Sequence, residues 1–500
     1  MSEIQLPKLR IINPDRPKRK KILLLSDDLR SPSGIAAMSR EFVLNSAMEF
    51  DWVQIGSLAQ HPDHGKIFDE SDGVNKILNI DDAYVKIYAH TGYGNAGVLR
   101  ELIQVEKPDV ILHFTDPRYW DWLYHMEHEL RTVYKIPIAY YNIWDCPPAP
   151  MWNKPFYQSC DLIMNISKQT HNLVKMVLGK SNYLDIDTKY ETEIDTSKVL
   201  ISYVPHGINK QYFRPMNETD ADWNDYQKFL EDFRNQNPDV EFIVFWNNRN
   251  AARKQPGDVV LSFKTFCDRL PKAKAKKCAL LMHTDIQDPN GTDLIEVKEN
   301  ICPDYKIIFS TEKLPTTVLN YYYNIADVTL NIASNEGFGL SNAESLMAGT
   351  MVIANVTGGL QDQMRFEDEN GKWIDFSETF TSNHAKTYTT HGRWVVPVYP
   401  SNRSLQGSLA TPYIFDDRCY FVDVADAMLE VYNFTKSERN RRGLSGREWL
   451  LSNESNMEAL TMTAGISRGI NTLLKNWTPP KSFIFKKIQA EEKPLNIGIV

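Results

Sequence analysis

The chain has 500 residues, of which 42% are hydrophobic and 24% charged, and its formal net charge is −8 at pH 7. This composition is that of a globular protein with two or more domains, and the negative charge gives no overall attraction to nucleic acid or to an anionic membrane. No run of about eighteen apolar residues and no signal-peptide core is visible, so we expect a cytoplasmic protein without stable membrane insertion. The six cysteines lack paired spacing, which favours reduced thiols over disulfides or a zinc site.

The first segments predict an arm followed by an α/β domain. Residues 1–17 are polar, contain three prolines, and are expected to form an N-terminal arm. Basic residues at 18–21 then precede an apolar strand at 22–25. The loop after this strand contains Gly34 and leads into a helix at 35–42. A strand, a glycine-containing loop and a helix in this order are typical of an α/β unit.

Further strand and helix patterns extend this domain, with strands expected at 52–55, 108–114, 136–143 and 161–167 and a helix at 97–105. Ligands of open α/β sheets lie beyond the carboxyl ends of the strands. His113 and Asp116 fall at such a position and are therefore candidate site residues. A packed core histidine and a turn-forming Asp-Pro pair explain the same two residues equally well.

Aromatic residues are unusually dense between residues 119 and 157. Most are expected in the core, but four fall in predicted loops, where their rings can stack on an acceptor: Tyr119, Trp120, Trp144 and Trp152. A polar, acidic stretch at 181–197 then leads to a linker strand at 199–204. We therefore predict a first domain at 18–200 and a second at 201–465.

The second domain opens with a predicted strand at 242–246, and three cations follow it within six residues: Arg249, Arg253 and Lys254. A basic helix start also explains such a cluster. Because the cluster directly follows a strand, we favour phosphate binding, with arginine as a bidentate donor and lysine as a point charge. Further strands are expected at 278–283 and 306–310.

The most informative stretch is 334–361, which opens with the small-residue loop E-G-F-G-L at 336–340. A helix should follow at 341–347, with Ser341 or Asn342 as its N-cap, and then a strand at 351–354. Glycines 337 and 339 let the backbone approach a ligand, and a helix N-terminus favours negative charge. The loop and helix also place two carboxylates, Glu336 and Glu344, beside this phosphate-friendly position.

Three more segments complete the chain. Residues 364–416 are polar and aromatic, and we interpret them as an insertion close to the acceptor side. Residues 421–450 are expected to be largely helical. A closing helix at 455–475 should cross back to the first domain, and 466–500 are assigned to this helix and a tail.

The spacing from Glu336 to Glu344, the following A-G-T and the glycine pair resemble the Glu-x7-Glu signature of retaining GT-B glycosyltransferases that use nucleotide-sugars. Arg249 and Lys254 resemble the R-x4-K pair of this family. The phrase V-P-H-G-I-N at 204–209 resembles its inter-domain segment, and Y-x-x-A-D before the glutamate loop is also similar. The resemblance covers roughly residues 20–475 and is weak in the first domain.

The resemblance implies two Rossmann-like domains that face each other across a cleft, and transfer of a sugar from a nucleotide-sugar, expected to be a UDP-sugar, with retention at the anomeric carbon. Glu336 would contact the sugar, Glu344 the ribose, and Arg249 and Lys254 the diphosphate. The catalytic residues would be Arg249, Lys254 and Glu336. The donor-binding residues would be Gly34, Arg249, Lys254, Glu336, Gly337, Phe338, Gly339, Leu340 and Glu344.

The acceptor side departs from the family, because Trp144 and Asp145 stand where a histidine is common. The acceptor-side candidates are His113, Asp116, Trp120, Trp144, Asp145 and Trp152. No D-x-D motif lies at a strand end near the donor site, so we expect no obligatory metal or other cofactor.

The texture of the chain also resembles, more weakly, the enzymes of T-even-type phages that glycosylate hydroxymethylcytosine in DNA. This resemblance implies a double-stranded DNA acceptor, glucosyl or arabinosyl transfer, and a host cytoplasm. Charge for DNA would come from three basic segments: Lys18–Lys21, Lys272–Lys277 and Arg439–Arg447. A solvated helix end also explains the arginines. A glycan, a lipid head group or a small molecule remain alternative acceptors, and a GT-B-shaped epimerase or a silent binding module remain alternative classes.

Overall fold

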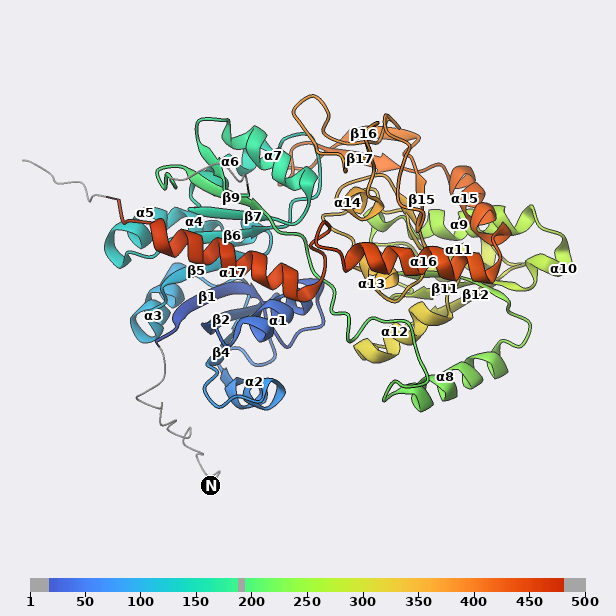
Figure 1. Ribbon diagram of the computed structural model, residues 1–500, viewed down its shortest axis with the longest axis horizontal. Helices are drawn as coiled ribbons and strands as arrows, with labels where there is room; N and C mark the ends of the chain where they lie inside the picture. Colours follow the sequence, from blue (N-terminus) through green and yellow to red (C-terminus); the bar gives the residue numbers. More distant parts are fainter. Residues whose placement is uncertain (1–17, 188–193, 481–500) are drawn as a thin grey trace, which may run out of the picture.

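The computed structural model describes residues 18–187 and 194–480, which form two α/β domains side by side (Figure 1). The predicted arm at 1–17 and the tail after residue 480 lie outside the described residues. The predicted fold class, two Rossmann-like GT-B domains, is confirmed by two separate, mainly parallel sheets with helices packed on them.

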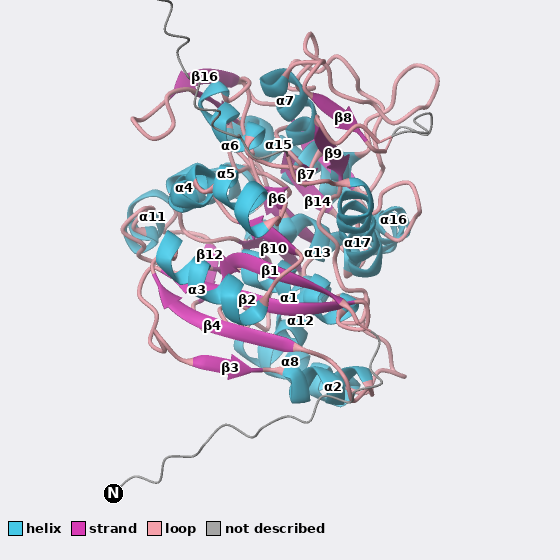
Figure 2. Cartoon of the chain, turned by 90° about the vertical axis from the view of Figure 1, so that its left-hand side faces the viewer, coloured by secondary structure: helices cyan, strands magenta, loops and turns pink. Residues whose placement is uncertain are grey.

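The first domain is built on a nine-stranded sheet with the order β3-β4-β2-β1-β5-β6-β7-β9-β8. All neighbours are parallel except β3 and β4. The strands are β1 (Lys20–Asp27), β2 (Phe50–Leu58), β3 (Ile67–Asp69), β4 (Val85–Thr91), β5 (Val110–Phe114), β6 (Ile138–Asn142), β7 (Leu162–Asn165), β8 (Tyr183–Asp185) and β9 (Val199–Tyr203). Figure 2, which faces this domain, shows β4, β2 and β1 following one another.

Strand β1 illustrates why these segments form buried parallel strands. Ile22 and Leu24 pack into the apolar cluster on one face of the sheet, whereas Leu23 and Leu25 pack into the cluster on the other. Successive side chains of a strand point to opposite faces, and a parallel sheet is covered by helices on both. A continuous apolar run is therefore the pattern that such a strand requires.

Helices cover both faces of the first sheet. They are α1 (Gly34–Ser46), α2 (Ser71–Leu78), α3 (Ala96–Glu106), α4 (Asp121–His125), α5 (Glu127–Glu129), α6 (Lys154–Gln158) and α7 (Lys168–Leu178), with short helical turns at Pro117–Trp120, Leu130–Tyr134 and Met151–Asn153. Helix α1 packs in the cluster that contains Ile22, while α3 and α7 pack in the cluster that contains Leu23.

The second domain has a parallel six-stranded sheet with the order β12-β11-β10-β13-β14-β15. Its strands are β10 (Phe242–Asn247), β11 (Cys278–His283), β12 (Lys306–Ser310), β13 (Val328–Asn331), β14 (Val352–Asn355) and β15 (Val395–Val398). Its helices are α8 (Trp223–Gln236), α9 (Pro256–Asp268), α10 (Lys272–Ala275), α11 (Leu294–Ile301), α12 (Thr316–Ile325), α13 (Leu340–Met347), α14 (Leu360–Met364), α15 (Phe421–Asn433) and α16 (Lys436–Leu450), with a turn at Ala252–Lys254.

The last helix, α17 (Ala459–Asn476), lies on the first domain (Figure 1, red). Met462, Ile466 and Ile470 are buried in the same cluster as β1. Beyond the helix, the Trp477 indole donates to Asp161 Oδ1 at 2.9 Å. The prediction of a closing helix that crosses back to the first domain is therefore confirmed.

Two sequence expectations about segment roles were wrong. The strand at 199–204 was expected to be a linker strand, but β9 pairs with β7 inside the first sheet. The stretch 364–416 was expected to be one insertion, but it contains β15, which pairs with β14 as the edge of the second sheet. Strand β15 has only four residues and lies within a long polar and aromatic stretch, so the sequence pattern does not reveal it.

The residues after β15 form a hairpin, β16 (Asn402–Gln406) and β17 (Ile414–Arg418), that contacts both domains. The Phe415 N–H donates to the carbonyl of Pro147 in the first domain at 2.8 Å. The Phe415 carbonyl accepts from Asn335 Nδ2 in the second domain at 2.7 Å. Arg118 donates to the Ala410 carbonyl at 2.9 Å. The hairpin therefore bridges the two domains.

A second contact between the domains is formed by Asp362 of α14. Its Oδ2 accepts from the Lys168 N–H at 2.9 Å and from the Tyr203 hydroxyl at 3.0 Å, both in the first domain. Burial raises the pKa of Asp362 to about 6, and the hydrogen bond from Lys168 only partly offsets this effect. Nearby, the Lys168 ammonium lies 3.6 Å from the centre of the Trp373 ring.

None of the helices found in residues 18–187 and 194–480 combines the length and the apolar character needed to cross a bilayer.

Candidate active site

The predicted donor loop connects β13 to α13 and differs from the expectation at the helix start. Helix α13 begins at Leu340, and its N-cap is Gly339, which has a φ of +90° and provides no side-chain cap. The prediction of Ser341 or Asn342 as N-cap was wrong, because both lie within the helix. A left-handed residue at this position favours glycine, and it leaves the helix N-terminus uncovered by a side chain.

The loop packs backbone to backbone against the turn at 358–359. The Gly359 N–H donates to the Glu336 carbonyl at 2.9 Å. A Cβ placed on Gly358 would lie 1.8 Å from the same carbonyl oxygen, and one on Gly359 would lie 2.2 Å from the Gly337 oxygen. Glycine is therefore required at this turn for the loop to adopt its observed position.

Glu336 is 6% exposed and lies at the centre of a charged cluster. Lys254 Nζ donates to its Oε1, Asn331 Nδ2 donates to the same oxygen at 3.2 Å, and Arg253 Nη1 lies 3.5 Å from its Oε2. Burial favours a higher pKa for Glu336, but the charges of Lys254 and Arg253 outweigh burial and hold the pKa below its usual range. The carboxylate is therefore ionised at neutral pH.

The structure brings together Lys254 and Glu336, as the sequence predicted, but it places Arg249 elsewhere. Arg249 Nε lies 2.7 Å from Asp288 Oδ2, and the arginine side chain is 63% exposed. The hydrogen bond from Arg249 lowers the pKa of Asp288 to about 2. The arginine that accompanies Lys254 is Arg253, whose Nη1 also donates to the Asn335 carbonyl at 2.7 Å.

Arg253 was thus expected only as one member of the three-cation cluster and was not among the predicted donor-binding residues. It was visible as the third cation of the cluster, next to Lys254. The turn at Ala252–Lys254 directs both side chains to Glu336. The signal in the sequence is the pair of adjacent cations, Arg253 and Lys254, whereas the R-x4-K spacing points to Arg249.

The other donor-loop residues have different environments. A Cβ on Gly34 would lie 3.1 Å from Leu340 Cδ1, so the first turn of the first domain touches the donor loop of the second. Phe338 is 2% exposed, and its ring centre lies 5.3 Å from that of His206, so its side chain belongs to the core. Glu344 Oε2 accepts from the Tyr323 hydroxyl at 2.6 Å.

Two acceptor-side candidates are core residues. His113 is fully buried, with its ring nitrogens 2.7 Å from the Tyr124 hydroxyl and 2.9 Å from the Thr115 hydroxyl, and burial lowers its pKa to about 3. Trp120 was expected in a loop where it could stack on an acceptor, but it is fully buried. That expectation was wrong, because the turn at Pro117–Trp120 points the indole into the core.

The remaining candidates lie where the hairpin meets the first domain. Asp116 pairs with Arg118, whose guanidinium also donates to the hairpin. Trp144 is 8% exposed and packs edge-on against Trp152, and Trp152 in turn lies 4.4 Å from the Tyr413 ring, measured between centres. The hairpin therefore covers these two tryptophans. Asp145 is the candidate beside the donor loop, since its Cβ lies 3.7 Å from where a Gly337 Cβ would be.

The basic segments proposed for DNA contain several structural ion pairs. Lys20 pairs with Asp109 and Lys21 with Glu106, each at 2.8 Å. Lys277 pairs with Glu241 at 2.5 Å. In α16, Arg439 pairs with Asp327 at 2.8 Å and Arg442 with Glu438 at 2.6 Å. These side chains are partly neutralised within the protein.

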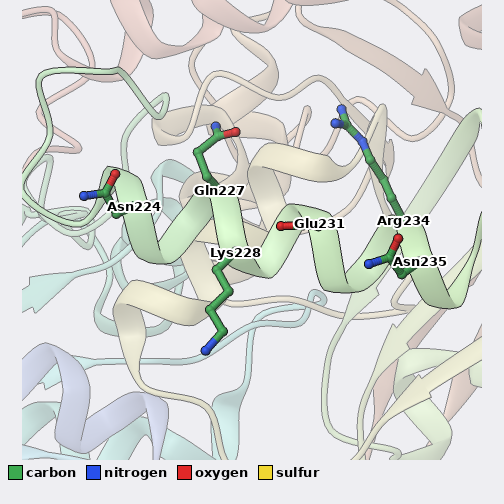
Figure 3. A pocket seen from close by; sticks show the side chains of 6 residues that line it. All are labelled: Asn224, Gln227, Lys228, Glu231, Arg234 and Asn235. Carbon is green, nitrogen blue, oxygen red and sulfur yellow. The ribbon is translucent and has the colours of Figure 1, made fainter.

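A shallow depression also runs along the outer face of α8 (Figure 3). Polar and charged side chains of this single helix line it: Asn224, Gln227, Lys228, Glu231, Arg234 and Asn235. None of them is a predicted site residue. Mixed charges on one helix face are typical of a solvated surface.

Comparison with known proteins finds a glycosyltransferase segment within the second domain. Residues 304–382, which include the donor loop and α13, match the family described as Glycosyl transferases group 1. D-inositol 3-phosphate glycosyltransferase of Thermomonospora curvata is 44% identical over 61 residues, which are 12% of this chain and 14% of that protein. The matched part is thus a small share of either chain.

Solved structures resemble nearly the whole chain. Sucrose-phosphate synthase from Thermosynechococcus elongatus is 14% identical with a TM-score of 0.60, covering 91% of this chain and 100% of that one. HepE of Anabaena, solved in complex with UDP and glucose, is 10% identical with a TM-score of 0.57 and the same coverage. These likenesses concern the fold, and the group 1 match supports the predicted enzyme class, a glycosyltransferase. The chain therefore has the GT-B fold, with a glycosyl transferases group 1 segment at residues 304–382.

Proposed function

We propose that this protein is a retaining glycosyltransferase that moves a sugar from a UDP-sugar to an acceptor hydroxyl. The observation that carries the proposal is the buried pair of Lys254 and Glu336 at the donor loop, with the half-exposed Arg253 beside it. The group 1 match at 304–382 supports it, as does the complex of a structural neighbour with UDP and glucose.

The cluster suits a reaction in which a diphosphate departs. The leaving nucleoside diphosphate gains negative charge in the transition state, and fixed cations in a site sheltered from water stabilise that charge. Lys254 and Arg253 are held in place by Glu336 and by the Asn335 carbonyl before any ligand arrives. Glu336 in turn has lone pairs that can accept from sugar hydroxyls.

Retention follows in this proposal from reaction on one face of the sugar, with the leaving phosphate oxygen taking the proton of the acceptor. No side-chain nucleophile is assigned. In this step the bond from the anomeric carbon to the phosphate oxygen breaks, and a bond from the anomeric carbon to the acceptor oxygen forms. The proton of the acceptor hydroxyl is transferred to the diphosphate. That no metal is obligatory stays a prediction.

For the acceptor, we propose a hydroxylated small molecule or glycan end in place of DNA. Trp120 is buried, Trp152 is covered by the hairpin, and several cations of the basic segments are paired, which removes much of the support for a duplex. The names of two similar proteins contain a phosphorylated sugar, sucrose phosphate, and a phosphorylated inositol, D-inositol 3-phosphate. Transfer to hydroxymethylcytosine in DNA is the alternative that an acceptor assay must distinguish.

The test offers the enzyme labelled UDP-glucose and a panel of acceptors: sugar phosphates, inositol phosphates, oligosaccharides, and duplexes with and without hydroxymethylcytosine. Transfer to a small acceptor with the α configuration of the donor preserved, read by NMR, is the expected result. Label confined to the modified duplex would replace our acceptor with DNA. Conversion of the donor without any acceptor would indicate an epimerase, and an inverted product would contradict retention.

Lys254→Ala is the matching variant. Loss of one cation that stabilises the leaving diphosphate should raise the activation free energy by about 3 kcal/mol, which slows transfer by about a hundredfold. An unchanged rate in this variant would remove the cluster from the mechanism.

A further inference from the structure

Hydrogen bonds connect three elements, β10, α12 and α13, and end at the carboxylate of Glu344. The Tyr323 hydroxyl, from α12, donates to Glu344 Oε2 at 2.6 Å. Asn247 Nδ2, at the end of β10, lies 2.9 Å from the same tyrosine oxygen and donates to it. Tyr323 is fully buried. A chain of hydrogen bonds therefore runs from Asn247 through Tyr323 to Glu344.

Apolar rings surround Tyr323, and its hydroxyl is the hydrogen-bond donor to the Glu344 carboxylate. The rings of Phe213 and Phe245 pack around Tyr323, with centres 5.9 and 5.1 Å away. In residues 18–187 and 194–480, the hydrogen bond found on the Glu344 side chain is the one from Tyr323. Burial raises the pKa of Glu344 to about 7, and the Tyr323 bond opposes this rise.

Other charged groups near α13 are engaged with different partners. Arg447 of α16 donates to the Phe213 and Met347 carbonyls. Asp362 of α14 faces Lys168 and Tyr203 of the first domain. Lys254 pairs with Glu336 before the helix. Tyr323 is thus the titratable group that acts directly on Glu344.

We infer that Tyr323, fixed by Asn247, is a positioning residue that favours the ionised form of Glu344 and orients it to accept from the ribose hydroxyls of the donor nucleotide. The inference rests on the proposed function, in which Glu344 contacts the ribose. With one oxygen held by Tyr323, the carboxylate presents its remaining lone pairs in a fixed direction. A protonated Glu344 would instead carry a donor and lose part of this acceptor capacity.

The experiment measures UDP binding by calorimetry between pH 5.5 and 9 for wild type, Tyr323→Phe and Tyr322→Phe. Tyr322 lies next to Tyr323 on α12, and its ring packs on Phe229 and Phe245. No partner of its hydroxyl is found in the described part of the chain. Because UDP itself titrates equally with each protein, the ratio of affinities between variant and wild type isolates Glu344.

The affinity for UDP should depend on the ionisation of Glu344. Glu344 must be ionised to bind ribose, so affinity falls as the pH falls through its pKa. Removing the Tyr323 hydroxyl takes away a bond to the charged form and raises that pKa. Tyr323→Phe should therefore bind UDP about tenfold more weakly near pH 7, with the deficit shrinking toward pH 9. Tyr322→Phe should follow wild type throughout.

A third variant, Glu344→Gln, distinguishes the ribose role of Glu344 from the positioning role of Tyr323. If Glu344→Gln binds UDP as wild type does, the ribose role of Glu344 in the proposed function is wrong. If Glu344→Gln binds weakly but Tyr323→Phe follows wild type at every pH, only the positioning role is wrong. A deficit in Tyr323→Phe that is the same at every pH, or that Tyr322→Phe shares, reports general packing and also overturns the inference.

Discussion

At the scale of single residues, the site depends on which arginine contacts Glu336. Arg249 and Arg253 are four residues apart and chemically identical, yet one pairs with Asp288 at the surface and the other lies against Glu336. Arg253 approaches Glu336 because its turn also places its guanidinium on the Asn335 carbonyl. The difference is set by partners 39 and 82 residues away in the chain.

This placement gives a comparison between two matched variants. Arg253→Ala should weaken UDP binding by about tenfold or more, because it removes a charged donor from the diphosphate position. Arg249→Ala should change UDP affinity by less than about threefold, since its exposed side chain is paired with Asp288 and not with Glu336. Calorimetry of both variants checks the ranking. A larger loss in Arg249→Ala would restore the assignment that the R-x4-K resemblance implies.

At the scale of elements, the donor loop and the turn at 358–359 act as one unit. Gly358 has a φ of +47°, and its absent Cβ is what lets the Glu336 carbonyl approach. Since backbone blocks the space on that side, a larger residue displaces the loop that carries Glu336.

Gly358→Ala should therefore destabilise the protein by about 3 kcal/mol or more, from a backbone clash added to backbone strain. Gly65→Ala is the matched control, because Gly65 also has a positive φ, +83°, but no atom lies within 4 Å of its Cβ position. It should cost only about 1–2 kcal/mol. Chemical denaturation measures both, and equal losses would show that the close approach is unimportant.

The β16–β17 hairpin offers an independent test of the bridge between domains. Tyr413→Ala removes the ring that packs on Trp152, a contact of about 1 kcal/mol beyond its buried area. Hydrogen exchange at the Phe415 amide, which donates to Pro147, should become several-fold faster. Leu409→Ala, at the fully exposed tip, should leave this exchange unchanged. Unaltered protection in Tyr413→Ala would mean that the hairpin is held without this ring.

At the scale of the whole molecule, the two domains share one apolar cluster and a few polar contacts, of which Asp362 is the most sensitive to pH. Its pKa of about 6 in the folded protein exceeds the usual 3.8 of an aspartate. The folded state therefore binds a proton more tightly than the unfolded chain. Stability from this group is complete below pH 4 and is lost as the pH rises to about 6, a change of about 3 kcal/mol.

Asp362→Asn should abolish this loss, because an amide does not titrate. The measurement is the free energy of unfolding of wild type and variant between pH 4 and pH 7, compared as a difference. The free energy of unfolding of the variant, relative to that of wild type, should increase as the pH rises, whatever the variant's absolute stability. A difference that stays constant over this range would mean that Asp362 is not the titrating group.

The sequence was sufficient for features that depend on contiguous patterns. The apolar runs of β1 and β5 predict buried parallel strands, and the loop at 336–340 with Glu344 is continuous in the chain. Features set by distant partners were not accessible. The burial of Trp120 and the bridging by Phe415 both depend on tertiary packing, and the role of Arg253 depends on Asn335. The start of α13 was also missed, because capping side chains at 341 and 342 suggested a later N-cap than Gly339.

The return of α17 to the first domain has a consequence for taking the protein apart. Residues 18–203 hold every strand of the first sheet, but expressed alone they would expose the apolar surface that Met462, Ile466 and Ile470 cover. A fragment of this domain should thus be made with Ala459–Asn476 added back, either as a separate peptide or joined by a linker. The elements of the second domain, by contrast, follow one another in the chain from α8 to α16.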